Sequence, residues 1–311
     1  MLDNLKDHHK IIIECLATFK YLTVDHMVKI WIRSRKQNLV KPLQELQKGK
    51  SPLIGCIKFW VLPWIWRLPY VYYLKKPWER FLLDDSQTIF DENNIRIPRG
   101  DATFFRMDYF HRMSTIDFHI DLLKYMNSNK VKIIRHVKII SASWYFDKTW
   151  ANRRKDGDKS RVKTRIDLAP NTNQNQKIHT TQYMIPDWVI QFSIEGKKET
   201  YLYELSNGKN TKKIIKQLYV HALAIKREIP KKLFETDRDT RVLCLFEHKS
   251  IMQAVMARMA SSANFQQYEE HFLFRPLGTS SNNFGKGWCT FKGGIRDFFG
   301  VPEPLESTAT D

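Results

Sequence analysis

Cysteine is scarce in this chain and is not arranged in pairs. Only four occur among 311 residues, and Cys15, Cys56, Cys244 and Cys289 lie far apart with no C-x-x-C sequence. This spacing excludes a zinc knuckle and predicts reduced thiols in a cytoplasm rather than disulfide bridges.

A long uninterrupted apolar run is also missing. Residues 52–74 come closest, but Lys58, Arg67 and three prolines interrupt them, and a membrane span needs about 20 continuous apolar residues. The first residues, MLDNLKDHHK, carry charges where a signal peptide has its apolar region. We therefore expect no membrane insertion and a cytoplasmic location.

Acidic residues are few for the number of basic ones. There are 33 Asp and Glu against 51 Lys and Arg, so the net charge is +18 and the sequence pI is about 9.7. Such a chain is attracted to polyanions, and nucleic acid is the leading candidate partner. An anionic membrane surface is the alternative, because basic charge alone does not separate the two.

Residues 1–100 carry the element order of a winged-helix DNA-binding domain. Apolar residues predict a helix over 8–20, Thr23 is a candidate N-cap of a second, and a third follows Arg33 with Ser34 and Gln37 as a capping box. Aromatic strands are expected near 57–62 and 70–75. The polar face of the third helix and its approach predict DNA contacts by Arg33, Arg35, Lys36, Gln37, Asn38, Lys41 and Gln44. The alternative is an ordinary solvated face.

Residues 82–101 are polar and contain Asn, Pro and Gly, which predicts a domain boundary near residue 100. We expect a second domain over 101–300 and a flexible tail over 301–311. Within the second domain, 147–177 is rich in basic and amide residues. We expect a flexible loop that closes over nucleic acid, with Arg153, Arg154 and Lys155 as contacts. A disordered insertion explains the same composition.

The second domain combines a helix carrying an acid with a series of strands. Phe110, Met113, Ile116, Ile120 and Leu123 predict one apolar helix face, and Asp117 lies inside that arc while His111 points away. Strands are then expected over 131–140, 183–194 and 200–206, a helix over 210–228 and a buried strand over 241–247. The order is α, β, β, β, α, β.

That order resembles the PD-(D/E)xK restriction-endonuclease-like fold, because Pro186-Asp187 opens the second strand and Glu204 lies near the end of the third. Neighbouring strands can bring two carboxylates to one side of a sheet, where Mg²⁺ or Mn²⁺ accepts oxygen ligands and phosphate. Asp117 is the third candidate ligand. The motif departs at Ser206, where a lysine is expected, and Lys209, Lys213 and Lys216 are candidate replacements.

An ordinary structural role remains open for several of these residues. Asp187 is a possible turn residue at the start of a strand, and Asp117 a possible partner of a buried arginine or a strand cap. His111 is a possible surface histidine, and Lys216 a possible surface charge.

The combined arrangement resembles the replication-relaxation proteins and the related MobC-type (MOB-C) relaxases of mobilizable plasmids. The resemblance rests on FHRMSTIDF, on IPDW and on YLYELSNGKNTKKIIKQLY, and it covers most of residues 8–250. It implies an α+β protein in a bacterial cytoplasm that nicks one DNA strand at a plasmid or integrative-element transfer origin with Mg²⁺ or Mn²⁺. It also implies a relaxosome accessory protein and a type IV coupling protein as partners.

The resemblance makes His111, Asp117, Asp187, Glu204 and Lys216 the candidate catalytic residues, with the three acids as metal ligands. A replication or relaxosome accessory protein that binds origin DNA without cleaving it is the alternative, and Ser206 favours it. Tyrosine relaxases with a histidine triad are disfavoured, because no His-x-His occurs.

Overall fold

The computed structural model describes residues 5–59, 68–76, 82, 95–98, 108–128, 137–144, 166–167, 183–278 and 284–299. Within these ranges the chain divides into two compact units, the first reaching Ile120 and the second starting at Asp121. Both units contain helices and strands, so the fold class is α+β, as the sequence predicted. The division lies inside a helix rather than near residue 100.

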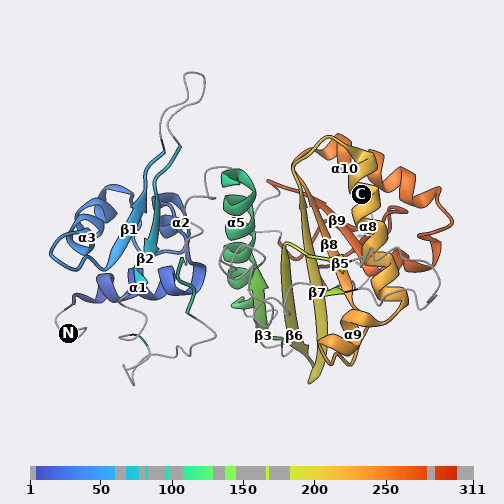
Figure 1. Cartoon of the computed structure of the whole chain (residues 1–311), viewed down its shortest axis with the longest axis horizontal. Helices are drawn as coiled ribbons and strands as arrows, with labels where there is room; N and C mark the ends of the chain where they lie inside the picture. Colours follow the sequence, from blue (N-terminus) through green and yellow to red (C-terminus); the bar gives the residue numbers. More distant parts are fainter. Residues whose placement is uncertain are drawn as a thin grey trace, which may run out of the picture. The chain divides into compact units, whose positions relative to one another are not determined.

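The first unit packs three helices with an antiparallel strand pair (Figure 1). Its core includes Ile12, Leu16, Leu39 and Leu43, which recur at helical spacing and are at most 2% exposed. The elements are α1 (Asp7–Phe19), α2 (Val24–Lys29), α3 (Gln37–Gln47), β1 (Ile54–Ile57) and β2 (Val71–Leu74).

Thr23 caps α2, as predicted. Its hydroxyl accepts a hydrogen bond from the amide of His26, and its own amide donates to Nδ1 of the same histidine. This reciprocal pair fixes the tautomer of the neutral imidazole, because Nδ1 is the acceptor and the ring proton must sit on Nε2.

The predicted capping box of the third helix is wrong. Lys36 occupies the N-cap position with helical dihedral angles and makes no side-chain cap bond. The amides of Asn38 and Leu39 donate instead to the carbonyls of Arg35 and Lys36. The helix therefore starts later than Ser34, and its first amides are bonded by backbone carbonyls.

The first strand also starts earlier than predicted, at Ile54 rather than 57. Gly55 pairs with Tyr73 of β2, and a Cβ on this glycine would collide with the Tyr73 ring. The close pairing therefore requires glycine at position 55. The aromatic residues that predicted the strand gave no indication of this requirement. Residues 60–67 of the expected hairpin lie outside the described ranges.

Residues 95–98, in the polar stretch that predicted the boundary, belong to the first unit. Ile95 and Ile97 are buried, and the Arg96 amide donates to the carbonyl of Ala17 at 2.8 Å. This segment is therefore bonded to α1.

Helix α5 (Tyr109–Met126) spans the division between the units. Met113, Ile116 and Ile120 are buried as predicted, but Phe110 is 60% exposed. Tyr109 occupies the buried position of that turn instead, with its ring 5.0 Å from the ring of Phe59.

The second unit is built on a seven-stranded mixed sheet in the order β11-β10-β9-β8-β7-β6-β3. β3, β6 and β7 form an antiparallel meander, whereas β7, β8 and β9 are parallel. The strands are β3 (Lys138–Trp144), β6 (Trp188–Ile194), β7 (Lys197–Ser206), β8 (Arg241–Phe246), β9 (Phe272–Pro276), β10 (Trp288–Cys289) and β11 (Ile295–Arg296).

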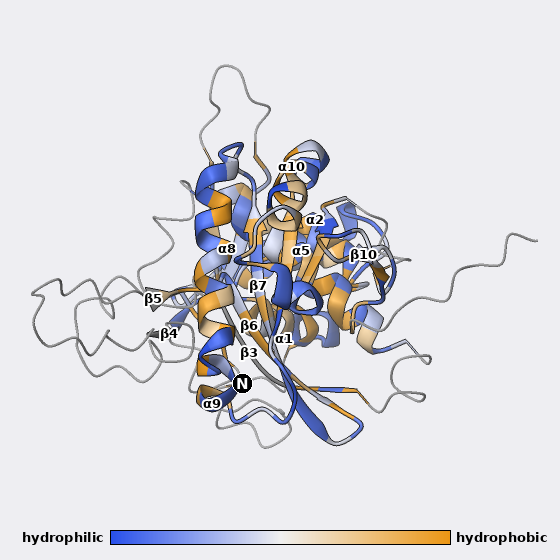
Figure 2. Cartoon of the chain, turned by 90° about the vertical axis from the view of Figure 1, so that its right-hand side faces the viewer, coloured by the Kyte–Doolittle hydropathy of each residue, from blue (hydrophilic) through white to orange (hydrophobic). Residues whose placement is uncertain are grey.

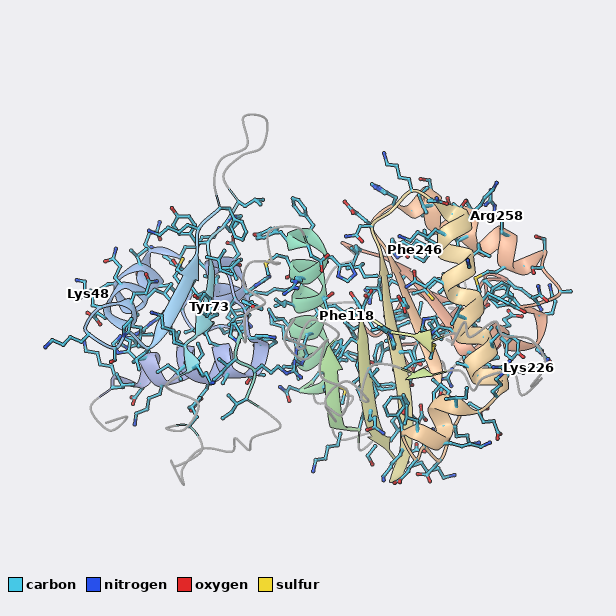
Figure 3. The ribbon with its side chains drawn as sticks, viewed as in Figure 1. Lys48, Tyr73, Phe118, Lys226, Phe246 and Arg258 are labelled. Carbon is cyan, nitrogen blue, oxygen red and sulfur yellow. The ribbon has the colours of Figure 1, made fainter. Side chains whose placement is uncertain are left out.

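Helices cover one face of this sheet, and Figure 2 shows α8 and α10 in front of it. Leu218 of α8, Cys244 of β8 and Val255 of α10 belong to one buried cluster. Lys226 and Arg258 lie on the outer surface of these helices (Figure 3). The helices of this unit, besides part of α5, are α8 (Thr211–Lys226), α9 (Ile229–Leu233), α10 (Lys249–Ala260) and the 3-10 helix η6 (Gln266–His271).

The opposite face is aromatic. Phe298 stacks on Tyr201 of β7 with ring centroids 5.6 Å apart, and its ring also meets Phe192 and Trp288. Tyr125 of α5 lies 6.1 Å from the same Phe298 ring. The sheet therefore has apolar cover on both faces, and a polar side chain in its middle needs a partner.

The predicted basic loop contains a short pairing. β4 (Ile166–Asp167) pairs antiparallel with β5 (Tyr183–Met184), so 147–177 is not loop throughout. Arg153, Arg154 and Lys155 lie outside the described residues, as does the predicted tail 301–311. Among the helices described, none is both long and apolar enough to cross a membrane.

Candidate carboxylate site on the central strands

Asp187 and Glu204 meet at one end of the β6–β7 pair. Trp188 pairs with Tyr203, and the Asp187 amide donates to the carbonyl of Tyr203 at 3.0 Å. This bond is one residue out of the regular register, so Asp187 lies beside Tyr203 and Glu204 at an irregular end of the strand pair. The charge of Asp187 acts on His221 of α8, which also bonds Glu204, so both acids lie near that helix.

Glu204 is a buried carboxylate with two donors from α8. Its side chain is 4% exposed. Oε2 accepts from Nε2 of Gln217 at 2.5 Å, and Oε1 lies 2.6 Å from Nε2 of His221. Gln217 and His221 are four residues apart and so share one helix face.

Burial lowers the pKa of His221 to about 4, against the opposing charge of Asp187. The imidazole is therefore neutral near pH 7. Because Nε2 faces a carboxylate, the ring proton sits on Nε2 and is donated to Glu204. Nδ1 is then an acceptor, and it is buried without a hydrogen-bond partner among the described residues.

Asp187 is only half-buried and also has a backbone role. Its Oδ2 accepts from the amide of Leu205 at 2.8 Å, one residue past Glu204 on β7. The side chain therefore fastens the start of β6 to the end of β7. This is a structural role, but it joins two strands and differs from the turn role that the sequence left open. It does not exclude a metal role, since an ionised carboxylate has about four lone-pair sites.

Asp117 lies in the first unit, whereas Asp187 and Glu204 lie in the second. Its Oδ1 is 2.8 Å from the ammonium of Lys29, and Oδ2 is 3.6 Å from Nε2 of His26. Burial alone would raise the pKa of Asp117, but hydrogen bonds from His26 and Lys29, together with the charge of Lys29, lower it to about 2. The side chain is 46% exposed.

The other predicted residues lie elsewhere on the helices and their approaches. His111 is on α5, where its carbonyl accepts from the hydroxyl of Thr115 at 2.9 Å. Lys216 is exposed on α8, as are Lys209 and Lys213 on the approach to that helix and in its first turn. Ser206 is half-buried at the end of β7.

The predicted DNA-facing residues are mostly on the surface of the first unit. Lys36 forms an ion pair with Asp25, and Arg33 is half-buried with an Nε that has no hydrogen-bond partner in the described ranges. The remainder are exposed, namely Arg35, Gln37, Asn38, Lys41 and Gln44.

Gln217 and His221 were not foreseen from the sequence. The available signal was a polar pair at i and i+4 beside the buried apolar positions Ile214, Leu218 and Ala222. His221 is itself buried, whereas Gln217 is exposed. Such a pair indicates a polar partner on the facing strand, but the pattern does not identify which residue that is. Glu204 supplies it.

Comparison of the chain with protein-family models, curated proteins and solved structures gives no match. The resemblance to relaxases therefore stays a prediction carried by the residues quoted for it.

Proposed function

We propose that the chain is a metal-dependent, site- and strand-specific DNA nickase of the relaxase type, acting at a plasmid or integrative-element transfer origin to start mobilization. The first unit serves as a winged-helix DNA-binding domain and the second as a PD-(D/E)xK-like nuclease domain. Duplex DNA at the origin is the substrate, and a relaxosome accessory protein and a type IV coupling protein are the partners, in a bacterial cytoplasm.

The placement of Asp187 beside Glu204, at the end of the β6–β7 pair, carries this proposal. The surrounding connectivity supports it, since α5 precedes the antiparallel meander of β3, β6 and β7, and α8 then leads to β8, which is parallel to β7. This is the α, β, β, β, α, β order predicted for the nuclease-like core. Two acids on adjacent strands, at one end of the pair and near one helix, are an oxygen-rich donor pair.

The residues at this site fit a hard divalent cation. Each carboxylate has lone-pair capacity beyond the bonds that Leu205 makes to Asp187 and that Gln217 and His221 make to Glu204. Asp187 and Glu204 would hold Mg²⁺ or Mn²⁺, which supplies polarisation of the scissile phosphate and a more acidic water. His221 orients Glu204, and exposed lysines on α8 attract the phosphate backbone.

A second function has its own support. Ser206 replaces the expected lysine, and Glu204 already has two donors and 4% exposure. A nuclease-like domain in which this network is purely structural would act as an origin-DNA-binding replication or relaxosome accessory protein. In that case the protein binds origin DNA and does not cleave it.

The test uses isosteric variants, because alanine would also remove structural hydrogen bonds. Asp187→Asn still accepts from Leu205, and Glu204→Gln still offers an oxygen to α8. We expect each to lower nicking of supercoiled transfer-origin DNA at least about 100-fold. DNA affinity should stay close to wild type, because Lys and Arg, and not these two acids, bind the phosphates. The Tm increase that Mn²⁺ gives the wild type should also disappear.

Glu199→Gln is the matched control, since Glu199 is another buried acid of β7 that pairs with Arg238 and the Tyr201 hydroxyl. It should retain nicking even if it melts lower. Wild-type nicking by Asp187→Asn, with its Mn²⁺-dependent Tm increase intact, would contradict the nickase and leave the DNA-binding function.

A further inference from the structure

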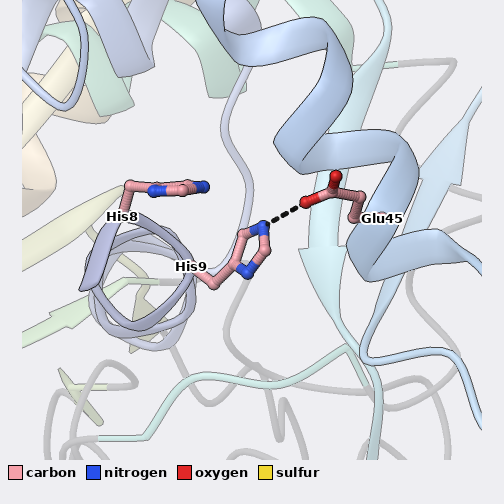
Figure 4. Close-up of side chains that lie close together, drawn as sticks. All are labelled: His8, His9 and Glu45. Atoms are coloured by element: carbon pink, nitrogen blue, oxygen red, sulfur yellow. Dashed lines mark ion pairs between the residues drawn. The ribbon is translucent and has the colours of Figure 1, made fainter. Parts of the chain in front are cut away.

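A second group of ligand-type side chains lies in the first unit, between α1 and α3. His8 and His9 are in the first turn of α1, and Glu45 is in the last turn of α3 (Figure 4). One ligand atom from each of the three lies within 4.8 Å of the others. Two imidazoles and one carboxylate form a donor set typical of zinc sites that keep a fourth position open.

His9 has a buried nitrogen beside a carboxylate without a hydrogen bond to it. The residue is 6% exposed, and its Nε2 lies 3.0 Å from Oε2 of Glu45. Nε2 nevertheless has no hydrogen-bond partner among the described residues, so the two atoms are close but not aligned as donor and acceptor. A buried polar atom in this state needs an explanation.

A shared cation explains that geometry. Ligand bonds of about 2.0 to 2.2 Å at a tetrahedral centre put neighbouring ligand atoms roughly 3.3 to 3.6 Å apart, with both lone pairs aimed at the ion instead of at each other. The observed separation of 3.0 Å lies just below this range, so a small movement of either side chain would admit the ion. A hydrogen bond, by contrast, would require the imidazole N–H to point at the oxygen.

His8 completes the set at the same end of α1. Its ring centroid is 4.3 Å from that of His9. Burial lowers the pKa of His8, and His9, Arg33 and Lys6 lower it further, against the opposing effect of Glu45. The imidazole is therefore neutral at physiological pH, which is the form that binds a metal.

We propose that His8, His9 and Glu45 form a binding site for a zinc-class divalent cation that ties the start of α1 to the end of α3. The site is separate from Asp187 and Glu204 and does not depend on DNA cleavage. Its ligands differ too, because two imidazoles favour Zn²⁺ or Co²⁺ over Mg²⁺. By fixing α3, the ion would hold the exposed polar face of that helix in one orientation.

Lys6 is the competing cation at this site. Its ammonium lies 3.9 Å from the same Oε2 of Glu45, and its side chain is 63% exposed. A long exposed side chain can leave at little cost. Removing its charge should therefore strengthen metal binding if the site is real, a result that a simple ion-pair cluster would not give.

The experiment is a Co²⁺ titration of the full-length apo protein, followed by visible absorption and repeated with Zn²⁺ as competitor. We expect tetrahedral Co²⁺ bands that saturate at one equivalent and disappear when Zn²⁺ is added. Glu45→Gln, His8→Ala and His9→Ala should each weaken binding by more than about tenfold. Lys6→Gln should tighten it, and lowering the pH from about 7.5 to about 5.5 should weaken it in the wild type.

Two controls keep the outcome specific. His248→Ala removes a histidine of the second unit, and Asp187→Asn alters the candidate cleavage site, so both should bind Co²⁺ as wild type does. If His9→Ala does not fold, the half-exposed Glu45→Gln still decides. Absence of tetrahedral bands at tens of micromolar Co²⁺, or equal affinity in wild type, Glu45→Gln and His9→Ala, would overturn the site.

Discussion

At the scale of single residues, Glu204 lies buried on the sheet face that α8 covers. On the adjacent strand β8 it pairs with Cys244, which belongs to the buried cluster under α8 and α10. Burial raises the pKa of the Cys244 thiol, and the charge of Glu204 raises it further. A carboxylate in such a place is tolerated only with strong donors, and Gln217 and His221 are those donors.

His221 makes the stability of the second unit depend on pH. Burial lowers the pKa of the folded-state imidazole from its usual 6.5 to about 4. Between these values the unfolded chain binds a proton that the folded chain does not. The free energy of unfolding must therefore fall as pH is lowered through this window. We expect this contribution to be on the order of 1 to 3 kcal/mol.

The measurement is urea unfolding of wild type and His221→Gln between pH of about 7.5 and about 4. The variant should be less stable near neutral pH, because Gln holds the Glu204 oxygen less well, but it should lose less stability on acidification. His119 is also buried with a lowered pKa, so the difference between the two proteins is the informative quantity. Parallel pH curves would contradict the assignment.

The sequence pointed to Asp187 and Glu204 because the first stands at the start of an apolar run and the second near the end of another, where a charge is conspicuous. It could not predict Gln217 and His221 as their partners, since helix spacing gives a face but not the strand residue below it. The same limit applies to the approach of His9 to α3, which depends on how α1 packs against that helix.

At the scale of elements, Asp117 connects α5 to α2 within the first unit. Its carboxylate binds Lys29 and lies near Nε2 of His26, the nitrogen that carries the ring proton when Nδ1 accepts from Thr23. Asp117→Asn should lower the stability of the first unit by up to about 1 kcal/mol, a small effect because the pair is half exposed. Nicking should stay near wild type if Asp117 is a structural residue.

The pH dependence of this contribution follows from the pKa of Asp117, which is lowered from 3.8 to about 2. Stabilisation is present above pH 3.8 and is lost as pH falls through about 2. A Tm comparison near neutral pH and near pH 2 measures it, with the difference between wild type and Asp117→Asn vanishing at the lower pH. Loss of nicking without loss of stability would instead make Asp117 catalytic.

Elements with strong periodicity were predictable, and short ones were not. β7, β8 and α8 carry long series of buried or regularly spaced apolar residues and were expected close to their observed bounds. β4, β5, β10 and β11 have two residues each, too few for alternation to be recognised. Their pairing depends on neighbours that are distant in the sequence.

At the scale of the whole molecule, the net charge of +18 favours a polyanionic partner but does not identify a binding surface. The surface of the first unit offers Arg35 and Lys41 as exposed cations, whereas Lys36 is already paired with Asp25. The second unit also exposes lysines, on α8 and at the β6–β7 turn. Net charge does not identify which of these surfaces binds DNA. The salt dependence of DNA affinity in variants of each surface can distinguish them.

The triple variant Arg35→Ala, Lys36→Ala, Lys41→Ala tests α3 as the DNA-facing element. Removing one cation that binds a phosphate should lower the slope of log affinity against log salt by about 0.9. Since Asp25 already neutralises part of the Lys36 charge, we expect a total decrease of roughly two rather than three.

The control variant changes Lys197, Lys198 and Lys226 to Ala. It removes the same formal charge from exposed positions of the second unit, two at the β6–β7 turn and one at the last residue of α8. These positions lie outside α3, so their removal should leave the salt slope of wild type if α3 supplies the phosphate contacts. A slope that stays unchanged in the α3 variant and falls in the control would remove α3 from the DNA interface and place the phosphates on the second unit.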